Sequence, residues 1–512
     1  MAKYDVVVVG AGNAGLSAAL QLLKEKKKIL VIEQHNLPGG CASSFVRGRY
    51  EFDPSLHELC NVGSKEAPGS VRKLMEYYGV KVDWVKIDDC FRVISKYSDG
   101  GAMDVTMPAG REKFIDAMDS YVPGSREAME RLFDLFDKTT KGIDYVTGGK
   151  APETEVLFKE HGDFLRTGAY PTLKVFKAVG LPQRAIDILS TYWPYLGVDL
   201  SRLNFVHYSQ MIKCYIDEYA YIPKHTSHEI SNAMLERIRD LGGEVWFNCR
   251  AEEFLFDGGK LCGVKTTNGT VECNYVLANI NPDIVYSKMV PKEMVPAWQK
   301  KLSAARKGNY SGIMYTCYFG LDCSAKELGI KDYSIFFFGT SDSAEEYKNI
   351  FKVFMHDDFF ILTCNNVVNQ EASPEGTCIV ALTTFTSADD WNDIDPARYG
   401  WQKSKVASEL VRELKERGGI DISGHIEEME TASPLTFARY VNVPDGAVYG
   451  FDVGDWDSML ARMMTMHKEQ DIPGLRLIGV AGAHGDGYNM AYANGQSVAM
   501  AAIGDLAKME SK

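Results

Sequence analysis

The sequence predicts an α/β protein in which a parallel sheet with flanking helices carries an inserted region of antiparallel sheet and helices. Three observations support this fold class. Residues 4–33 alternate strand, helix and strand patterns, residues 108–218 have mainly helical spacing of apolar residues, and residues 308–390 hold separate strand-like runs. Those runs cover the following residues: 313–321, 334–338, 359–364 and 378–385. An amphipathic helix is expected over residues 401–417.

The composition is that of an ordinary folded protein. The chain has 512 residues, of which 45% are hydrophobic and 24% charged, which excludes a disordered chain. At roughly 150 residues per domain, the length indicates about three structural units. The net charge of −13 disfavours nucleic acid as a partner, because an acidic surface repels phosphate backbones.

Neither a membrane span nor a signal peptide is expected. No window reaches about 18 uninterrupted apolar residues, and the N-terminal apolar run at residues 6–9 is too short for a signal sequence. The 11 cysteines include no C-x-x-C pair. Their irregular spacing predicts reduced thiols in a cytoplasmic protein and disfavours a zinc site.

The strongest motif stands at the N-terminus. A β-branched run at residues 4–9 leads into a G-x-G-x-x-G pattern at residues 10–15, a helical pattern at 16–24, and a second strand at 28–32 that ends at Glu33. Strand, glycine turn, helix, strand and acid in this register predict a Rossmann-type dinucleotide site.

Each part of the motif has a physical role. Gly10 makes the tight turn, Gly12 lets the backbone approach a pyrophosphate, and Gly15 lets the helix pack close to the strand. The helix N-terminus offers N–H groups and a positive dipole end to the phosphates. Glu33 is placed to accept both ribose hydroxyls, and its charge disfavours a 2′-phosphate.

Later segments identify the dinucleotide. Gly39 and Gly40 precede a hairpin pattern at residues 45–53, and this glycine pair resembles the second fingerprint of the amine-oxidase-like FAD proteins, although an ordinary turn has the same sequence. Residues 241–251 resemble the adenine-side segment of that family, with Ala251 facing the adenine. Near the C-terminus, a strand at 474–482, a glycine-rich turn and a helix at 491–506 would aim a helix dipole at the flavin.

These features together resemble the phytoene desaturase, carotenoid isomerase and retinol saturase group of FAD proteins. The resemblance is carried by residues 33–41, 51–53 with His57, 192–197, 221–224, 242–245, 278–282 and the C-terminal turn. It implies an FAD-binding domain built from residues 1–107, 219–290 and 440–512, a helical lid at 108–218, and a substrate-binding sheet and helix region at 291–439. The implied cofactor-binding residues are Gly10, Gly12, Asn13, Ala14, Gly15, Glu33, Gln34, Gly39, Gly40, Cys41, Ala42, Ser43, Ala251, Asn279, Gly482, Asp486, Asn489 and Met490.

The chain departs from the family pattern at three places. Cys41 stands where an arginine is frequent, as in retinol-saturase-like members, and His225 and Thr226 replace a usual Gly-Gly pair. The C-terminal turn, residues 484–489, is more polar than the version in carotenoid desaturases. A carotenoid-type cavity is therefore not assumed, and a substrate with a polar end, or a proton donor in the turn, is expected.

The helical region is rich in aromatic side chains. They are Phe164, Tyr170, Phe176, Tyr192, Trp193 and Tyr195. A helical core explains them, as does a lid over an apolar pocket or a surface that touches a membrane.

Double-bond chemistry on a flavin also needs a proton donor or acceptor. The family positions give six catalytic candidates: Tyr488, His484, Asp486, His225, Tyr221 and His57. Tyr488 is the first choice, because it lies in the turn expected to meet the flavin and keeps its proton at neutral pH. Packing explains Tyr488 and His57 equally well, and helix capping explains Asp486.

The sequence therefore predicts an FAD-dependent oxidoreductase that acts on a carbon–carbon double bond of a lipophilic or unsaturated-acid substrate. Reduction is favoured over desaturation, because the second motif resembles the saturase type. A redox-neutral isomerase and a lipid or prenyl carrier on the same fold are alternatives, and an amine oxidase is a weaker one. Only one dinucleotide fingerprint is evident, so the sequence does not identify the electron donor or acceptor.

Overall fold

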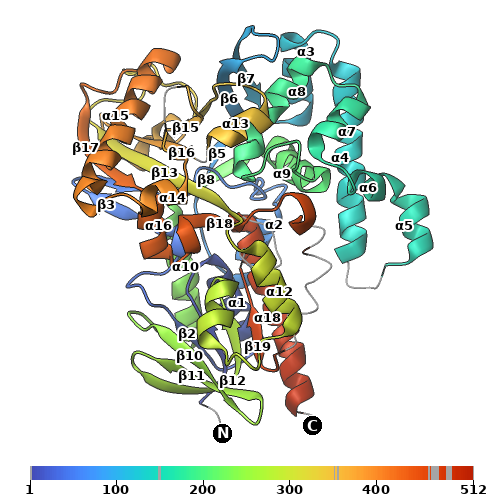
Figure 1. Ribbon diagram of the computed structural model, residues 1–512, viewed down its shortest axis with the longest axis vertical. Coiled ribbons are helices and arrows are strands. Elements are labelled where there is room, and N and C mark those ends of the chain that lie inside the picture. The colour runs from blue at the N-terminus through green and yellow to red at the C-terminus, as the bar shows by residue number, and fades with distance from the viewer. Residues whose placement is uncertain are drawn as a thin grey trace.

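The chain is organised around two sheets that lie at opposite ends of the molecule (Figure 1). The computed structural model describes residues 3–147, 152–350, 352–354, 357–458, 462, 472–479 and 487–510. Both chain ends lie near the first sheet, so the N-terminal motif and the C-terminal helix belong to the same part of the fold (Figure 1).

The first sheet is the predicted nucleotide-binding sheet. Its strands, in order across the sheet, are β10 (Ala251–Asp257), β11 (Lys260–Thr266), β12 (Gly269–Ala278), β1 (Tyr4–Val9), β2 (Ile29–Ile32) and β9 (Glu244–Trp246), with β19 (Leu475–Leu477) beside β12. The pairs around β1 and β2 are parallel, whereas β10 and β11 form an antiparallel extension. Strand β2 is entirely apolar and buried, and β1 is buried except at Asp5, as expected for strands covered on both faces.

Helices α1 (Asn13–Lys24) and α18 (Tyr488–Glu510) pack closely beside this sheet, with α10 (Ser227–Asp240) against α1. Two glycines permit the close approach. A Cβ on Gly15 would stand 1.9 Å from the carbonyl oxygen of Gly10, and a Cβ on Gly495 would stand 2.2 Å from that of Ala14. The first contact seats α1 on the glycine turn, and the second seats α18 on α1.

The second sheet contains the strands expected between residues 308 and 390. Its order is β17 (Ile426–Ala432), β13 (Tyr310–Leu321), β16 (Cys378–Phe385), β15 (Phe360–Thr363), β14 (Ser334–Phe337), β6 (Asp89–Lys96) and β7 (Ala102–Pro108), with β18 (Ala447–Phe451) beside β13. All pairs are antiparallel except β14 with β6. The amphipathic helix expected at 401–417 is α15 (Tyr399–Gly418).

The sheet membership differs from the predicted domain boundaries in two places. Strands β6 and β7 fall within residues 1–107 or end beside them, and β18 falls within 440–512, yet all three join the second sheet rather than the first. Ile335 pairs with Arg92, so the contact that recruits β6 spans about half the chain and has no local signature. Of the predicted segment 1–107, only the part before residue 89 therefore lies outside the second sheet.

The helical region follows the prediction and then changes at residue 190. It contains α3 (Arg111–Tyr121), α4 (Arg126–Thr147), α5 (Thr154–Glu160), α6 (Gly162–Thr167), α7 (Thr172–Val179), α8 (Gln183–Leu189) and α9 (Phe205–Glu218). After α8 the chain forms a 3-10 turn, η2 (Ser190–Tyr195), which contains Pro194. Proline lacks the N–H that a continuing α-helix needs.

The aromatic side chains of this region are mostly buried. Phe164, Phe176, Tyr192 and Trp193 are at most 4% exposed, whereas Tyr170 is 43% exposed. This distribution favours the helical-core interpretation over a membrane-facing surface. Among the described residues, no helix combines the length and apolar character that crossing a bilayer requires.

Shorter elements complete the fold. They are the hairpin β3 (Phe45–Arg47) and β4 (Tyr50–Phe52), the pair β5 (Trp84–Ile87) and β8 (Ala220–Pro223), and helices α2 (Ser70–Tyr78), α11 (Pro282–Ile284), α12 (Ala297–Arg306), α13 (Ser343–Asn349), α14 (Ala388–Asn392) and α16 (Pro434–Val441). All 11 cysteines are free thiols, and only Cys262 is exposed.

Candidate active site

One cavity of about 1310 Å³ joins the two sheets. It begins at the carboxyl ends of β1 and β2, beside Val9 and Ile32, and ends against the face of the second sheet at Met314 and Thr383. The carboxyl edge of a parallel sheet is where nucleotide ligands bind in this fold class. The cavity therefore starts at the predicted dinucleotide site and continues without interruption into a chamber beside the second sheet.

Glu33 organises the nucleotide end of the cavity. Its Oε2 accepts a 2.7 Å hydrogen bond from the backbone N–H of Ala11, and its Oε1 accepts one of 2.8 Å from that of His35. Each carboxylate oxygen has a further lone pair, so hydroxyl groups of a ribose can still be accepted. Gln34 and Ala251, both expected to bind the cofactor, line the same end of the cavity.

The glycine turn forms a cradle without side chains at the start of α1. Gly10 has φ +98°, and a Cβ there would stand 2.7 Å from the carbonyl oxygen of Asn279. A Cβ on Gly12 would stand 2.9 Å from the Asn279 Nδ2. Gly12 is the N-cap of α1 and provides no side-chain cap, so the helix N-terminus faces the cavity uncovered. These features fit a dinucleotide pyrophosphate.

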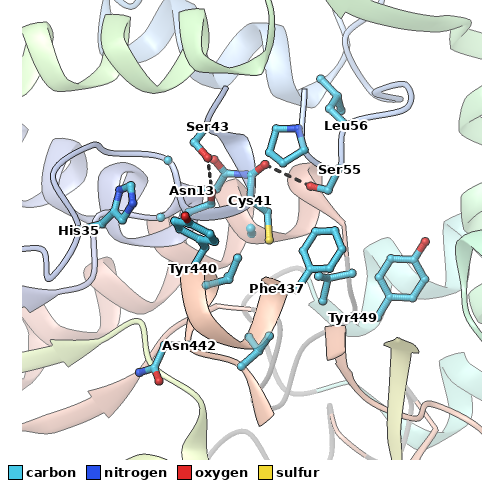
Figure 2. A pocket seen from close by; sticks show the side chains of 18 of the residues that line it. Asn13, His35, Cys41, Ser43, Ser55, Leu56, Phe437, Tyr440, Asn442 and Tyr449 are labelled. Atoms are coloured by element: carbon cyan, nitrogen blue, oxygen red, sulfur yellow. Dashed lines mark hydrogen bonds between the residues drawn. The ribbon is translucent and has the colours of Figure 1, made fainter. Parts of the chain in front are cut away.

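The second glycine pair forms the next wall. Gly39 and Gly40 both have positive φ, at +112° and +61°, and the Gly39 N–H donates to the Ala11 carbonyl at 2.8 Å. The following residue, Cys41, accepts hydrogen bonds at its carbonyl oxygen from the hydroxyls of Tyr488 (2.7 Å) and Ser55 (3.1 Å). Its side chain points into the pocket (Figure 2). Burial raises the pKa of this thiol to about 11, so it is uncharged at neutral pH.

The C-terminal segment reaches the cavity where the prediction placed it. Gly479, Tyr488 and Asn489 line the wall, and the Asn489 Nδ2 donates to the Asn61 Oδ1 at 2.6 Å. Three predicted residues, Gly482, His484 and Asp486, lie outside the described residues.

Not every predicted cofactor residue lines the cavity. Asn13, Ala14, Ser43 and Asn279 do, together with the residues named above. Gly15, Ala42 and Met490 do not. Ala42 is fully buried, and its carbonyl accepts from the Ser231 hydroxyl at 2.7 Å, so it supports the loop from behind.

The far chamber is apolar and aromatic. Its walls come from η2, α9, the second sheet and α16: Pro194, Tyr195, Tyr215, Met314, Tyr318, Phe359, Ile361, Phe385, Phe437, Val448 and Tyr449. Figure 2 shows Phe437 and Tyr449 beside the Cys41 end of the pocket. The second sheet thus floors the cavity.

Comparison with known proteins agrees with this geometry. Residues 8–75 match a family model described as an NAD(P)-binding Rossmann-like domain. An all-trans-retinol 13,14-reductase of Rattus norvegicus is 24% identical over 93% of this chain and 82% of its own length. A prolycopene isomerase of Daucus carota is 21% identical over 88% and 72%, and a phytoene desaturase of Neurospora crassa is 24% identical over 87% and 76%. The chain is a homologue of these enzymes.

Solved structures extend the likeness to the fold. An oxidoreductase from Methanosarcina mazei has a TM-score of 0.63 at 14% identity, covering 96% of this chain and 99% of its own. Wild-type putrescine oxidase has a TM-score of 0.63 at 13% identity, covering 98% and 99%. A Rab GDI from Plasmodium falciparum scores 0.50 at 15% identity, covering 98% and 96%. The fold is thus that of amine-oxidase-like flavoproteins, and the relatives identify the chain as an oxidoreductase.

The catalytic candidates differ in their position relative to the cavity. Tyr488 and His57 line the cavity, whereas Tyr221 and His225 do not. Tyr221 is 5% exposed in β8 and packs in the core beneath the cavity wall, and His225 is exposed to solvent. The geometry therefore places neither side chain at the cavity, because one is packed in the core and the other faces solvent.

His57 faces the chamber as an uncharged imidazole. Its Nε2 lies 3.3 Å from the Thr383 hydroxyl, and its ring centroid lies 6.1 Å from that of Tyr195. Burial lowers its pKa to about 4, so it is neutral at physiological pH. A neutral imidazole positions a ligand or accepts a proton more readily than it donates one.

The sequence reasoning missed the neighbouring carboxyl group, Glu58. It is 6% exposed, lines the cavity, and has its pKa raised to about 8 by burial. A charged residue set among Leu56, Leu59 and Cys60 was the available signal, since glutamate is rarely buried without a partner.

Proposed function

We propose that this protein is an FAD-dependent oxidoreductase that acts on a carbon–carbon double bond of a lipophilic or unsaturated-acid substrate. We further propose that it works in the direction of reduction. The retinol reductases among its relatives and the saturase-like Cys41 support that direction. Bound FAD would supply hydride transfer through its N5 atom.

The observation that carries this proposal is the continuity of the cavity. A glycine cradle and Glu33 lie at one end, and an aromatic chamber floored by the second sheet lies at the other. A carrier on the same fold would need the chamber but not the cradle. An enzyme needs both, because the two bound groups must meet in one enclosed space.

The residues of the chain divide the work along the cavity. Glu33, Gly12 and Ala251 would hold the nucleotide half, and the Cys41 loop and Asn489 would border the ring end. Tyr195, Tyr318 and Phe437 exclude water from the chamber and orient an apolar substrate. Tyr488 keeps its proton, since burial raises its pKa well above the usual value. Its hydroxyl, however, already donates a hydrogen bond to the Cys41 carbonyl. Its contact therefore supports a positioning role.

The experiment begins with the absorption spectrum of the purified protein, before and after addition of FAD. The proposal predicts a bound flavin that is reduced anaerobically and reoxidised by an alkene such as a polyene alcohol or an enoic acid. Flavin bleaching by a saturated substrate alone would instead indicate desaturation, and turnover without net redox change would indicate an isomerase. A colourless protein that ignores added FAD would support the carrier alternative and contradict the proposal.

A further inference from the structure

Glu58 occupies an unusual place at the wall of the aromatic chamber. It lies in the irregular segment between β4 and α2, and its side chain faces a cluster of three tyrosines. The Tyr192 ring is stacked on that of Tyr195 at 5.1 Å between centroids and lies 5.2 Å from that of Tyr215. A carboxyl group is thus held at the wall of a largely apolar and aromatic chamber.

Hydrogen bonds within the protein satisfy only part of this carboxyl group. Its Oε1 lies 3.4 Å from the Tyr192 hydroxyl, but that hydroxyl also donates to the Cys90 carbonyl at 2.5 Å. The Tyr215 hydroxyl donates to the backbone carbonyl of Glu58, at 3.5 Å. Among the described residues, Oε2 is buried and forms no hydrogen bond of acceptable geometry, and the hydroxyl of Tyr195, which lies beside the carboxyl group, forms none either. A buried polar atom of this kind normally has one.

The electrostatic surroundings favour the uncharged acid. Among the described residues, no lysine or arginine forms an ion pair with Glu58. The titratable groups that face it are all uncharged at neutral pH. Burial lowers the pKa of the adjacent imidazole of His57, and it raises the pKa of the neighbouring thiol and phenols: Cys90, Tyr192, Tyr195, Tyr215 and Tyr333. Ionising a carboxyl group there would bury an uncompensated charge.

We propose that Glu58 is a specificity-determining residue whose protonated Oε2 donates a hydrogen bond to an uncharged carbonyl or hydroxyl oxygen at the polar end of the substrate. This inference rests on the proposed function, since it assumes a lipophilic ligand in the chamber. It narrows the substrate class, because a carboxylate end would bring a negative charge to a place where the described part of the chain supplies no counter-cation. Alcohols, aldehydes and ketones on unsaturated chains are thus favoured over unsaturated acids.

The first arm of the test needs no ligand. Infrared difference spectra of the wild type against Glu58→Gln should show the carbonyl stretch of a protonated carboxylic acid at about pH 6, and the band should disappear with a midpoint near pH 8. Glu76→Gln, which changes an exposed glutamate on α2, is the matched control and should leave the band intact. Absence of the band from the wild type at about pH 6 overturns the inference.

The second arm measures binding of β-ionone, an unsaturated ketone, and of the hydrocarbon in which its carbonyl is replaced by CH₂. Both should quench tryptophan fluorescence of the holoprotein. Ketone binding should weaken about tenfold in Glu58→Leu, which has no hydrogen-bond donor at this position. In the wild type it should weaken as much when the pH is raised above the titration of Glu58, because the ketone oxygen cannot donate a hydrogen bond to a carboxylate. Glu58→Gln keeps a hydrogen-bond donor and should bind the ketone equally well below and above the pH at which Glu58 titrates.

The outcomes separate the two proposals. If both probes bind the wild type but the ketone responds to neither Glu58→Leu nor pH, the inference about Glu58 is wrong and the proposed function stands. If neither probe binds although FAD does, the lipophilic substrate class is wrong, and the inference falls with it.

Discussion

The Tyr488 hydroxyl donates a 2.7 Å hydrogen bond to the backbone carbonyl of Cys41, across 447 positions of the chain. This bond ties the start of α18 to the loop that follows the second glycine pair. The Ser55 hydroxyl donates to the same carbonyl at 3.1 Å and lies 3.2 Å from the Tyr488 hydroxyl, so both side chains converge on one acceptor. The Tyr488–Cys41 bond is one of several contacts that join the N- and C-terminal segments at the cavity, with the Asn489–Asn61 and Ser17–Tyr492 hydrogen bonds.

Replacing Tyr488 with Phe is expected to weaken FAD binding about tenfold and to lower turnover by no more than that. The variant loses one hydrogen bond to a backbone carbonyl, which costs on the order of 1 kcal/mol. A general acid would cost about 10²–10⁴-fold in the chemical step. Titration with FAD and single-turnover rates distinguish the two roles, and Tyr77→Phe, at an exposed position on α2, is the control.

Gly12→Ala should abolish tight dinucleotide binding while the protein remains folded. The added Cβ would stand 2.9 Å from the Asn279 Nδ2, inside the cradle at the start of α1. The matched control is Gly504→Ala, where a Cβ on α18 meets no atom within 4 Å. That control should bind FAD normally and gain up to about 1 kcal/mol of stability from helix propensity. Equal FAD affinity in the two variants would show that the cradle does not hold the cofactor.

Thr226 holds a backbone conformation that suits glycine. It has φ +92° at the N-cap of α10, and its hydroxyl donates to the Glu51 Oε1 at 3.2 Å. Thr226→Gly and Thr226→Ala both lose this bond, but only glycine relieves the strain. We expect the glycine variant to exceed the alanine variant by about 1 kcal/mol in the free energy of unfolding, since such strain costs roughly 1–3 kcal/mol and glycine's added chain entropy opposes part of the gain. Equal denaturation midpoints would argue against strain.

Glu58 should make stability depend on pH. Its folded-state pKa of about 8 lies above the ordinary 4.5, so the native state favours the protonated form. The contribution of this proton to the free energy of unfolding is complete below pH 4.5. It is lost as the pH rises to about 8, by about 1.4 kcal/mol per pH unit. Relative to Glu58→Gln, the wild type should therefore lose stability over that window and no further above it. The raised pKa values of Asp53 and Glu346 affect both proteins alike and cancel in the difference. Parallel curves of unfolding free energy against pH would contradict this.

Local patterns in the sequence predicted the elements that position the nucleotide site. The run from Tyr4 to Glu33 specifies its strands and helix by period and by glycine placement, and both recur in the structure. The four strand-like runs after residue 308 were equally readable, because each is a buried apolar segment bounded by polar turns.

Local sequence patterns could not predict the pairing of distant strands or the direction of individual side chains. Strand β6 joins β14 across more than 200 residues, and neither strand carries a mark of its partner. Glu58 lies in an irregular segment, where no period indicates which side chains face inward. Phe437 and Tyr449 reach the cavity from a helix and a strand whose place in the fold depends on such distant contacts.

The most direct test of the account is the stoichiometry and affinity of FAD binding, measured by visible absorption and calorimetry on the full chain and on Gly12→Ala. We predict one FAD per chain, held through Glu33 and the glycine cradle, with affinity lost in the variant. Failure of the wild type to bind FAD, or displacement of FAD by NADPH from the same cradle, would contradict the central claim.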